Sequence, residues 1–493
     1  MNAPHTPPPH PRSLAALRQR HGDAYKWRLL IAMSVGMVAS VMSATIFNVA
    51  TPHLMRDFGL GHDAVQWAVT AYMAAMTVAM LPTAWLIDRF GFRHVFLGAL
   101  AILGIGSIGG ALSPAFGMVV AMRILQGLAA GMLQPMSTLM VLRAFPLEDQ
   151  GRAMGLLGFG IVLAPAVAPV LGGFLVDHFG WRPIFLIVLP GCIPALIMGH
   201  FLMPLRDVDT PSGLPPRHGF DWWGLGLLGT AILALLQTAS GLHAHGFASL
   251  PTVIGVSIAT VALALFVRHS RRVPGALIQA SIFRDRPLRV GTVVAFTYGL
   301  GLFGSTYLLP VFMQTVLHFN ATSAGLVLLP SGIALAVMMP VAGNLTNKLA
   351  THRQTAAGMA LFALAFFMFF AVAYGEHPAW LAAGLTVAAV VSRIGLALTL
   401  PALNIGSLRT LPKDKTAQGS SLTNCVRQVG GTMGISLGAV FVETRSQMLG
   451  GGNGAEHEAF AEAFLIIGAL FVLATVIALG MKAKTAQPET VSE

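Results

Sequence analysis

The sequence reads AWLIDR at residues 84–89, directly after a long apolar segment, and GNLTNK at residues 343–348, again directly after such a segment. The two stretches are 259 residues apart, and the Gly-Gly pair at 172–173 recurs 258 residues later at 430–431. Two independent matches at nearly one separation indicate an internal repeat. We therefore predict a chain built from two similar halves.

The composition indicates which surroundings the chain needs. Of its 493 residues, 55% are hydrophobic and only 10% are charged, whereas a soluble protein carries about 25% charged residues. This excludes a soluble globular enzyme, and we expect no enzymatic activity. The net charge of +11 comes from few charges scattered through apolar sequence, so no basic surface for nucleic acid can form. We expect membrane lipid, and no nucleic acid, around this chain.

The two cysteines give no sign of a cofactor. Cys192 and Cys425 lie in apolar segments, without a CxxC pair or a histidine cluster nearby. Neither a disulfide framework nor a metal site is therefore expected. The phosphate-binding patterns GxxxxGKS and GxxxxGKT do not occur either, which excludes direct use of ATP by this chain. We expect no metal and no cofactor.

Apolar runs long enough to cross a membrane recur along almost the whole chain. A helix needs about 20 residues to span a hydrocarbon core about 30 Å thick. Fourteen runs approach or exceed this length, and each predicts a membrane-spanning helix. Their approximate limits are residues 29–50, 65–87, 94–113, 116–142, 152–177, 183–204, 222–242, 250–267, 289–316, 323–346, 355–374, 379–403, 419–442 and 460–481.

The repeat and the apolar runs together divide the chain into five parts. We predict a tail at 1–28, a six-helix half at 29–204, an inserted two-span region at 205–288, a second six-helix half at 289–481 and a tail at 482–493. The expected fold class is an all-α membrane protein with 14 transmembrane helices.

Lysine and arginine residues set the predicted orientation, because they accumulate in cytoplasmic loops. With the N-terminus in the cytoplasm, that side holds 24 of the 30 basic residues and the opposite side holds only three. We therefore expect both termini in the cytoplasm. The remaining three, Arg123, Arg393 and Arg427, fall inside spans. A charge there costs about 2.5–3.5 kcal/mol on insertion and is usually retained for function.

Motif-like stretches occur in order along the chain. They read TAWLIDRFGFR at 83–93, RILQGLAAG at 123–131 and APAVAPVLGG at 164–173. These resemble the loop motif GxLxDRxGRR, the RxxQG motif and the exporter motif GPxxGG of the major facilitator superfamily. Residues 45–52 and 420–431 are similar to its fourteen-span drug:proton antiporters of the EmrB/QacA type.

This resemblance implies the major facilitator fold, with two inserted helices between the two six-helix halves. It also implies a secondary active multidrug exporter of the inner membrane, which works by alternating access on small amphipathic substrates and is driven by the proton gradient. A periplasmic adaptor protein is left open as a partner. The aspartate that members usually carry two residues before Thr45 is Ser43 here. Two alternatives therefore stay open: another coupling mode, or a non-transporting sensor or scaffold with a transporter fold.

Four residues of the loop motif are predicted to form a cytoplasmic gate, namely Asp88, Arg89, Gly91 and Arg93. A carboxylate beside guanidinium groups at a helix end can form a charge-assisted network. Such a network would latch one face of the protein shut. In the second half the aspartate position is Asn347, so that half can offer only a neutral hydrogen bond.

Polar residues inside the spans are predicted to line the pathway of substrate or protons. They are Thr45, Asn48, Arg123, Gln126, Asn424, Arg427 and Gln428. Two roles are open for Arg123, which either takes part in transport or only braces the first span through Asn48 and Thr45. The i, i+3, i+4 spacing of residues 424, 427 and 428 places them on one helix face. For Arg393 we expect an ordinary interhelical hydrogen bond.

Pro165, Pro169, Gly172 and Gly173 put two prolines and a small-residue face into one span. Prolines allow a kink, and glycines allow two helices to approach closely. We predict that this segment forms a rigid, close-packed hinge between the halves.

Overall fold

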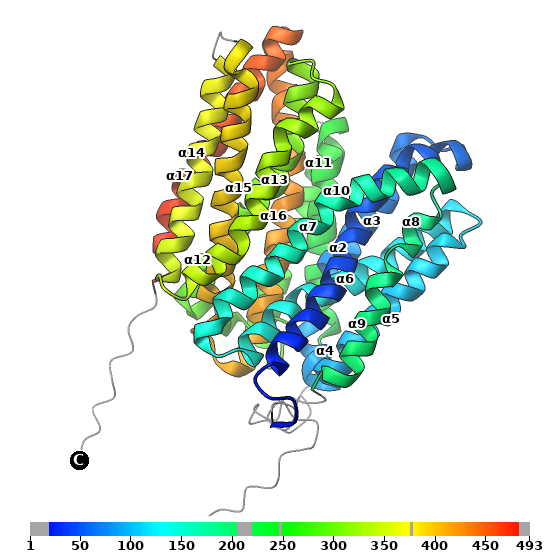
Figure 1. The fold of residues 1–493 in the computed structure, drawn as a ribbon, viewed down its shortest axis with the longest axis vertical. Coiled ribbons are helices and arrows are strands. Elements are labelled where there is room, and N and C mark those ends of the chain that lie inside the picture. Colours follow the sequence, from blue (N-terminus) through cyan, green and yellow to red (C-terminus); the bar gives the residue numbers. More distant parts are fainter. Residues whose placement is uncertain (1–18, 205–218, 246–248, 375–377, 483–493) are drawn as a thin grey trace, which may run out of the picture.

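The computed structural model describes residues 19–204, 219–245, 249–374 and 378–482. The outer parts of both predicted tails and residues 205–218 of the predicted insert lie outside the described residues, as do the side chains of Pro165 and Pro169. Within the described ranges, every regular element is helical and no strand occurs. The expected all-α fold is therefore confirmed (Figure 1).

Helices α2 to α9 form the first part of the chain. Their bounds are α2 (Tyr25–Phe58), α3 (His62–Ala79), α4 (Thr83–Phe90), α5 (Phe92–Ala111), α6 (Phe116–Ala144), α7 (Leu147–Phe179), α8 (Pro183–Leu186) and α9 (Leu189–Leu202). The second predicted span is broken, because residues Ala64–Ala79 and Thr83–Phe90 meet at an angle of 55°. Pro82 stands in this break, and a proline cannot donate the backbone hydrogen bond of a continuous helix.

The remaining helices follow from residue 222 onward. Their bounds are α10 (Trp222–His245), α11 (Leu250–Arg272), η1 (Ala280–Arg284), α12 (Arg286–Val311), η2 (Phe312–Val316), α13 (Ala321–Thr346), α14 (Thr351–Tyr374), α15 (Pro378–Leu408), α16 (Lys413–Met448) and α17 (Asn453–Leu479). Each of the predicted apolar ranges falls on one helix or on a consecutive pair of helical elements.

Helix length and hydropathy indicate how many helices can cross a membrane. Among the described residues, twelve helices are long and apolar enough to cross a membrane, or thirteen if the bent pair α3 and α4 forms one span. The fourteen spans expected from the sequence therefore stay a prediction.

Glycines allow the helices to approach closely. On α12, a Cβ atom added to Gly299 would collide with the carbonyl oxygen of Arg427 on α16. On α16, a Cβ atom on Gly430 or Gly434 would in turn meet backbone oxygens of α12. Small residues at such crossings let main chains touch, which is how helices associate where lipid offers no hydrophobic driving force.

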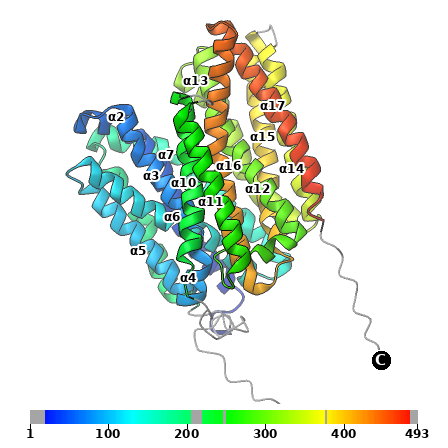
Figure 2. The same ribbon diagram turned by 180° about the vertical axis from the view of Figure 1, so that it is seen from behind.

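The buried apolar residues gather into separate cores. One core contains only residues between Val294 and Met481. Another consists mainly of residues between Tyr25 and Met203. Helices α10 and α11 pack on each other, and α10 also contacts α3 and α16, beside the boundary between the two cores (Figure 2).

The two groups of helices meet closely at one end of the molecule. There the start of α7 lies against the end of α13, while the helices diverge toward the other end (Figure 1). Glycines again permit the contact, because a Cβ atom on Gly151 would collide with the carbonyl oxygen of Gly343. The molecule is therefore closed between its halves at this end.

Candidate functional site

Arg123 lies deep inside the first group of helices and is only 1% exposed. Its guanidinium carbon is 4.4 Å from the ring centroid of Phe47 and 4.0 Å from that of Tyr72. Its Nη1 atom donates to the Ser43 carbonyl oxygen at 2.9 Å and to Gln126 Oε1 at 3.0 Å. The charge is thus held by two aromatic faces and by neutral oxygens.

The bracing contact of Arg123 reaches α2 at Ser43, and not at the two residues expected from the sequence. Thr45 Oγ1 donates within its own helix to the Val41 carbonyl oxygen at 3.0 Å, and Asn48 is exposed. The Nε and Nη2 atoms of Arg123 are buried without a hydrogen-bond partner in the described part of the chain. From the sequence, Ser43 was notable only because an aspartate was expected at its position. In the structure it is the residue of α2 that anchors Arg123.

A second polar set lies on α16 and reaches the first group of helices. Arg427 Nη2 donates to Asn424 Oδ1 at 2.7 Å, which confirms their shared helix face, and to Gln134 Oε1 of α6 at 3.2 Å. Gln428 Nε2 lies 3.4 Å from the Met73 sulfur of α3. Unlike Arg123, Arg427 thus joins two parts of the molecule that are far apart in the sequence.

Two residues of this contact were not predicted. Gln134 binds Arg427, and Ser420 Oγ donates to the carbonyl oxygen of Pro135 at 3.1 Å. Gln134 stands eleven residues after Arg123, which is about three helical turns and thus on the same face of α6. That spacing was a usable signal for Gln134, whereas the pair Ser420-Ser421 does not show which of the two serines bonds to another helix.

Arg393 makes the interhelical hydrogen bond expected for it. Its Nη2 atom donates to Thr306 Oγ1 at 3.2 Å, and this bond joins α15 to α12 within the second group of helices.

The loop motif lies where α4 ends and α5 begins. Gly91 separates the two helices with a φ of 80°, a conformation that glycine adopts without strain. Asp88 and Arg89 are exposed at this end, whereas Arg93 is 5% exposed and its Nη2 atom lies 3.1 Å from His200 Nδ1. Helix α4 also contacts α16, so this helix touches the other half, and the gate stays a prediction.

The corresponding position in the second half makes a contact of its own. Asn347 Oδ1 accepts a hydrogen bond from the backbone N–H of Gly151 at 3.0 Å. This bond is neutral, as the replacement of aspartate by asparagine implied. It ties the end of α13 to the start of α7.

The exporter-type motif on α7 packs inside the first half. A Cβ atom on Gly172 would lie 2.8 Å from Ile46 of α2, and one on Gly173 would meet no atom within 4 Å. The side chains of Pro165 and Pro169 are outside the described residues. Close packing of α7 against the second half is found instead at Gly151, Gly155 and Gly158, so the glycines before the motif make the contact predicted for the motif itself.

The three arginines within the helices are held by neutral groups in the described part of the chain. The hydrogen bonds of Arg123, Arg393 and Arg427 described above all go to neutral oxygens. Across the described ranges, no group of three or more His, Cys, Asp or Glu side chains could hold a metal ion.

This geometry defines a class of protein, a polytopic helical membrane protein whose two halves meet through polar residues within the helices. A family model described as Major Facilitator Superfamily matches residues 33–435. The chain belongs to the major facilitator superfamily, and it is a membrane transporter rather than an enzyme.

Relatives and solved structures agree with this assignment. The chain is 31% identical over 450 residues to the multidrug resistance protein B homolog of Mycobacterium tuberculosis, covering 89% of this chain and 80% of that protein. It is 28% identical over 422 residues to the multidrug export protein EmrB of Escherichia coli, covering 85% and 81%. The crystal structure of the human organic anion transporter MFSD10 shares the fold, with a TM-score of 0.66, 14% identity and coverage of 92% and 99%.

Proposed function

We propose that this protein is a secondary active exporter of small amphipathic compounds that works by alternating access in the inner membrane. Its relatives are named multidrug resistance and multidrug export proteins, and the family match covers most of the chain. These names support export of chemically diverse compounds rather than uptake of one nutrient.

The observation that carries this proposal is how the two halves meet. Asn347 and Gly151 share one neutral hydrogen bond, and glycines on α7 and α13 permit the close approach around it. Separating such a contact costs little, because neither group carries a charge that would be left unpaired. An interface that opens readily at one end suits a protein that exposes its centre to each side of the membrane in turn.

We propose the proton gradient as the driving force, with both termini in the cytoplasm and with a periplasmic adaptor protein as a candidate partner. Ser43, whose carbonyl oxygen holds Arg123, has no carboxylate that could take up a proton, so the proton would have to be carried by another group. Another coupling mode, or a non-transporting sensor or scaffold, is the alternative.

An efflux assay in a host that lacks its own pumps tests the proposal. Cationic, neutral and anionic compounds are each measured with and without a protonophore. Export that stops with the protonophore supports a proton-driven exporter. Export that continues would contradict proton coupling, and no export of any compound would favour the sensor or scaffold.

A further inference from the structure

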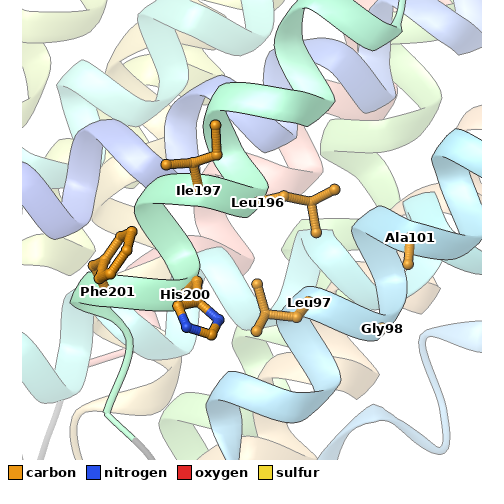
Figure 3. Close-up of a pocket in the computed structure, with 7 residues that line it drawn as sticks. All are labelled: Leu97, Gly98, Ala101, Leu196, Ile197, His200 and Phe201. Carbon is orange, nitrogen blue, oxygen red and sulfur yellow. The ribbon is translucent and has the colours of Figure 1, made fainter.

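A groove of about 540 Å³ runs between α5 and α9 on the outer surface of the first half (Figure 3). All but one of the residues that line it are apolar. They are Leu97, Gly98 and Ala101 of α5, and Leu196, Ile197, His200 and Phe201 of α9.

This groove faces the surroundings of the protein and not its centre. Ile197 is 56% exposed and Phe201 is 69% exposed. In a membrane, an exposed apolar surface of this kind is in contact with lipid acyl chains. Some part of a lipid must therefore occupy the groove.

His200 stands at one end of the groove, beside Leu97 and Phe201 (Figure 3). Its Nδ1 atom lies 3.1 Å from Nη2 of Arg93. A guanidinium can only donate, so Nδ1 must accept this hydrogen bond. In the neutral imidazole the proton is then on Nε2 of His200, whose side chain is exposed. The groove thus ends in a hydrogen-bond donor that is backed by a buried arginine.

The loop motif lies beside Arg93 at this end of the groove, and its charges sum to one net positive charge, because Asp88 offsets one of the two arginines. The segment 88–94 contains two arginines, one aspartate and His94, and the side chains of Arg89 and His94 are exposed. The Tyr25 hydroxyl donates to the Leu202 carbonyl oxygen at 2.6 Å, which places the end of α9 beside the start of α2. The N-terminus is on the same side of the membrane, and the distribution of basic residues predicts that this side is the cytoplasm.

We propose that the groove between α5 and α9 binds one anionic phospholipid of the cytoplasmic leaflet. An acyl chain lies along the apolar residues, and the phosphate accepts the hydrogen bond of His200 Nε2 close to Arg93. This inference rests on the membrane orientation given under the proposed function.

The headgroup, and not the acyl chain, gives this site its preference. An acyl chain gains little free energy when it moves from bulk lipid into an apolar groove, because the two surroundings are equally apolar. Basic pockets on the cytoplasmic side, by contrast, attract anionic headgroups. Because Arg93 belongs to the loop motif, a phosphate bound at His200 also stabilises the gate end of α5.

A second groove offers an internal comparison. It has a volume of about 220 Å³ and is lined by residues of α2 and of the segment around the start of α9, among them Val38, Val188 and Gly191. None of its lining residues is charged or a histidine, so lipid in this groove should show no headgroup preference.

Native mass spectrometry of the full-length protein tests the site. The protein is equilibrated with equal amounts of phosphatidylglycerol and phosphatidylcholine, and the retained lipids are identified by mass. We expect phosphatidylglycerol to be preferred. His200→Leu should lower this preference about fivefold, the effect of losing one hydrogen bond to the headgroup. His200→Gln should keep most of it, because an amide can accept from Arg93 and donate outward.

Filling the groove provides an independent variant. A Cβ atom on Gly98 meets nothing within 4 Å, so Gly98→Leu occupies the groove without disturbing the helix contact and should lower retention of both lipids. Gly226 on α10 is equally open, and Gly226→Leu is the matched control. Equal retention of both lipids by the unmodified protein, an unchanged preference in His200→Leu, or unchanged retention in Gly98→Leu would overturn the proposal. Lipid retention does not depend on export, so failure here is distinguishable from failure of the proposed function.

Discussion

The side-chain oxygen of Asn347 accepts a hydrogen bond from the backbone N–H of Gly151 at 3.0 Å, across 196 residues of sequence. Asn347 occupies the position in the second half that Asp88 occupies in the first. The two halves therefore use a neutral amide and a carboxylate at corresponding places. The amide contact depends on close packing, because Gly343 leaves no room for a side chain against the backbone of Gly151.

The first prediction concerns this packing. In Gly343→Val the new Cβ atom would collide with the Gly151 carbonyl oxygen and lie 2.9 Å from the α-carbon of Gly155. Overpacking of this kind costs about 1–3 kcal/mol, and it destabilises the arrangement in which α7 and α13 are in contact. We expect a thiol reagent added from the cytoplasmic side to label the buried Cys425 faster in this variant, with Cys192 as the internal reference.

Gly332→Val provides the control for this prediction, because Gly332 lies on the same helix and its Cβ position is open. Its labelling rate should equal that of the unmodified protein. Equal rates in the two variants would show that the contact between α7 and α13 does not hold this end closed.

A second prediction concerns the gate. Asp88→Asn keeps the size of the side chain but removes its charge, so that the charge-assisted contacts of the loop motif weaken. We expect the transport rate to fall further than the amount of protein in the membrane, and both should be measured in the same cells. Unchanged transport at normal expression would leave Asp88 as a solvated residue at the end of α4.

The third prediction follows from Asp221, just before α10. Its carboxylate accepts hydrogen bonds from Gly224 N at 2.7 Å, from Leu277 N at 2.9 Å and from His269 Nε2 at 2.7 Å. Burial raises the pKa of Asp221, but these hydrogen bonds and the nearby imidazole outweigh burial and hold the pKa below its usual value. The ionised carboxylate therefore fastens α10 to α11 and to the segment that leads into α12.

Because the pKa of Asp221 is lower in the folded protein than in the unfolded one, its stabilising effect is complete above the unfolded-state pKa. It is lost as the pH falls through the folded-state pKa. Asp221→Asn should lower stability at neutral pH by about 1–3 kcal/mol, the range for a hydrogen bond to a charged group. Thermal unfolding across the acidic range is the measurement. The difference in stability between the unmodified protein and Asp221→Asn should shrink as the pH falls. A difference that stays constant with pH would contradict this account.

The fourth prediction is the topology. The division of basic residues places residues 95 and 282 near the cytoplasmic side and residues 180 and 450 outside. Reporter fusions at these four positions should give matching signals within each pair and opposite signals between the pairs. If the C-terminus were found on the outer side, the predicted topology would be wrong, because an even number of spans places both ends on the same side.

The helices could be predicted well because their signal is local. Each apolar run is bounded by polar residues or by a glycine or proline, and helix is the structure that satisfies the backbone within lipid. The break between α3 and α4 was not predicted, although Pro82 stands in it. Apolarity continues through the break, so the sequence pattern does not reveal it.

The candidate site could be predicted only in part. Arg123, Gln126, Asn424 and Arg427 are recognisable because polar side chains are rare in spans, and the structure shows each in a polar contact. Their partners are the Ser43 carbonyl oxygen and Gln134, which depend on how α6 crosses α2 and α16. A backbone carbonyl has no signal in a sequence, so the anchor of Arg123 could not be found without the fold.

The final prediction separates the two central arginines. Every contact described for Arg123 lies within the first half, and its side chain is 1% exposed. A substrate therefore has no access to it in this arrangement. Its cation–π contacts are worth about 2 kcal/mol when desolvated, so Arg123→Gln should loosen α2, α3 and α6 together. We expect export of all substrates to fall alike.

Arg427 should behave differently, because it is half-buried and lies where α16 meets α6. Its known partners, Asn424 and Gln134, are neutral, so its charge is not compensated by them. A carboxylate on a substrate could pair with this guanidinium, whereas a dication would meet an uncompensated positive charge in a medium that screens poorly. Arg427→Gln should therefore reduce export of anionic compounds more than that of neutral ones.

Competition assays with both variants test whether the two arginines differ in this way. Equal loss of all substrates in Arg427→Gln would make this arginine a brace like Arg123. Preferential export of a dication by the unmodified protein would refute the charge argument altogether.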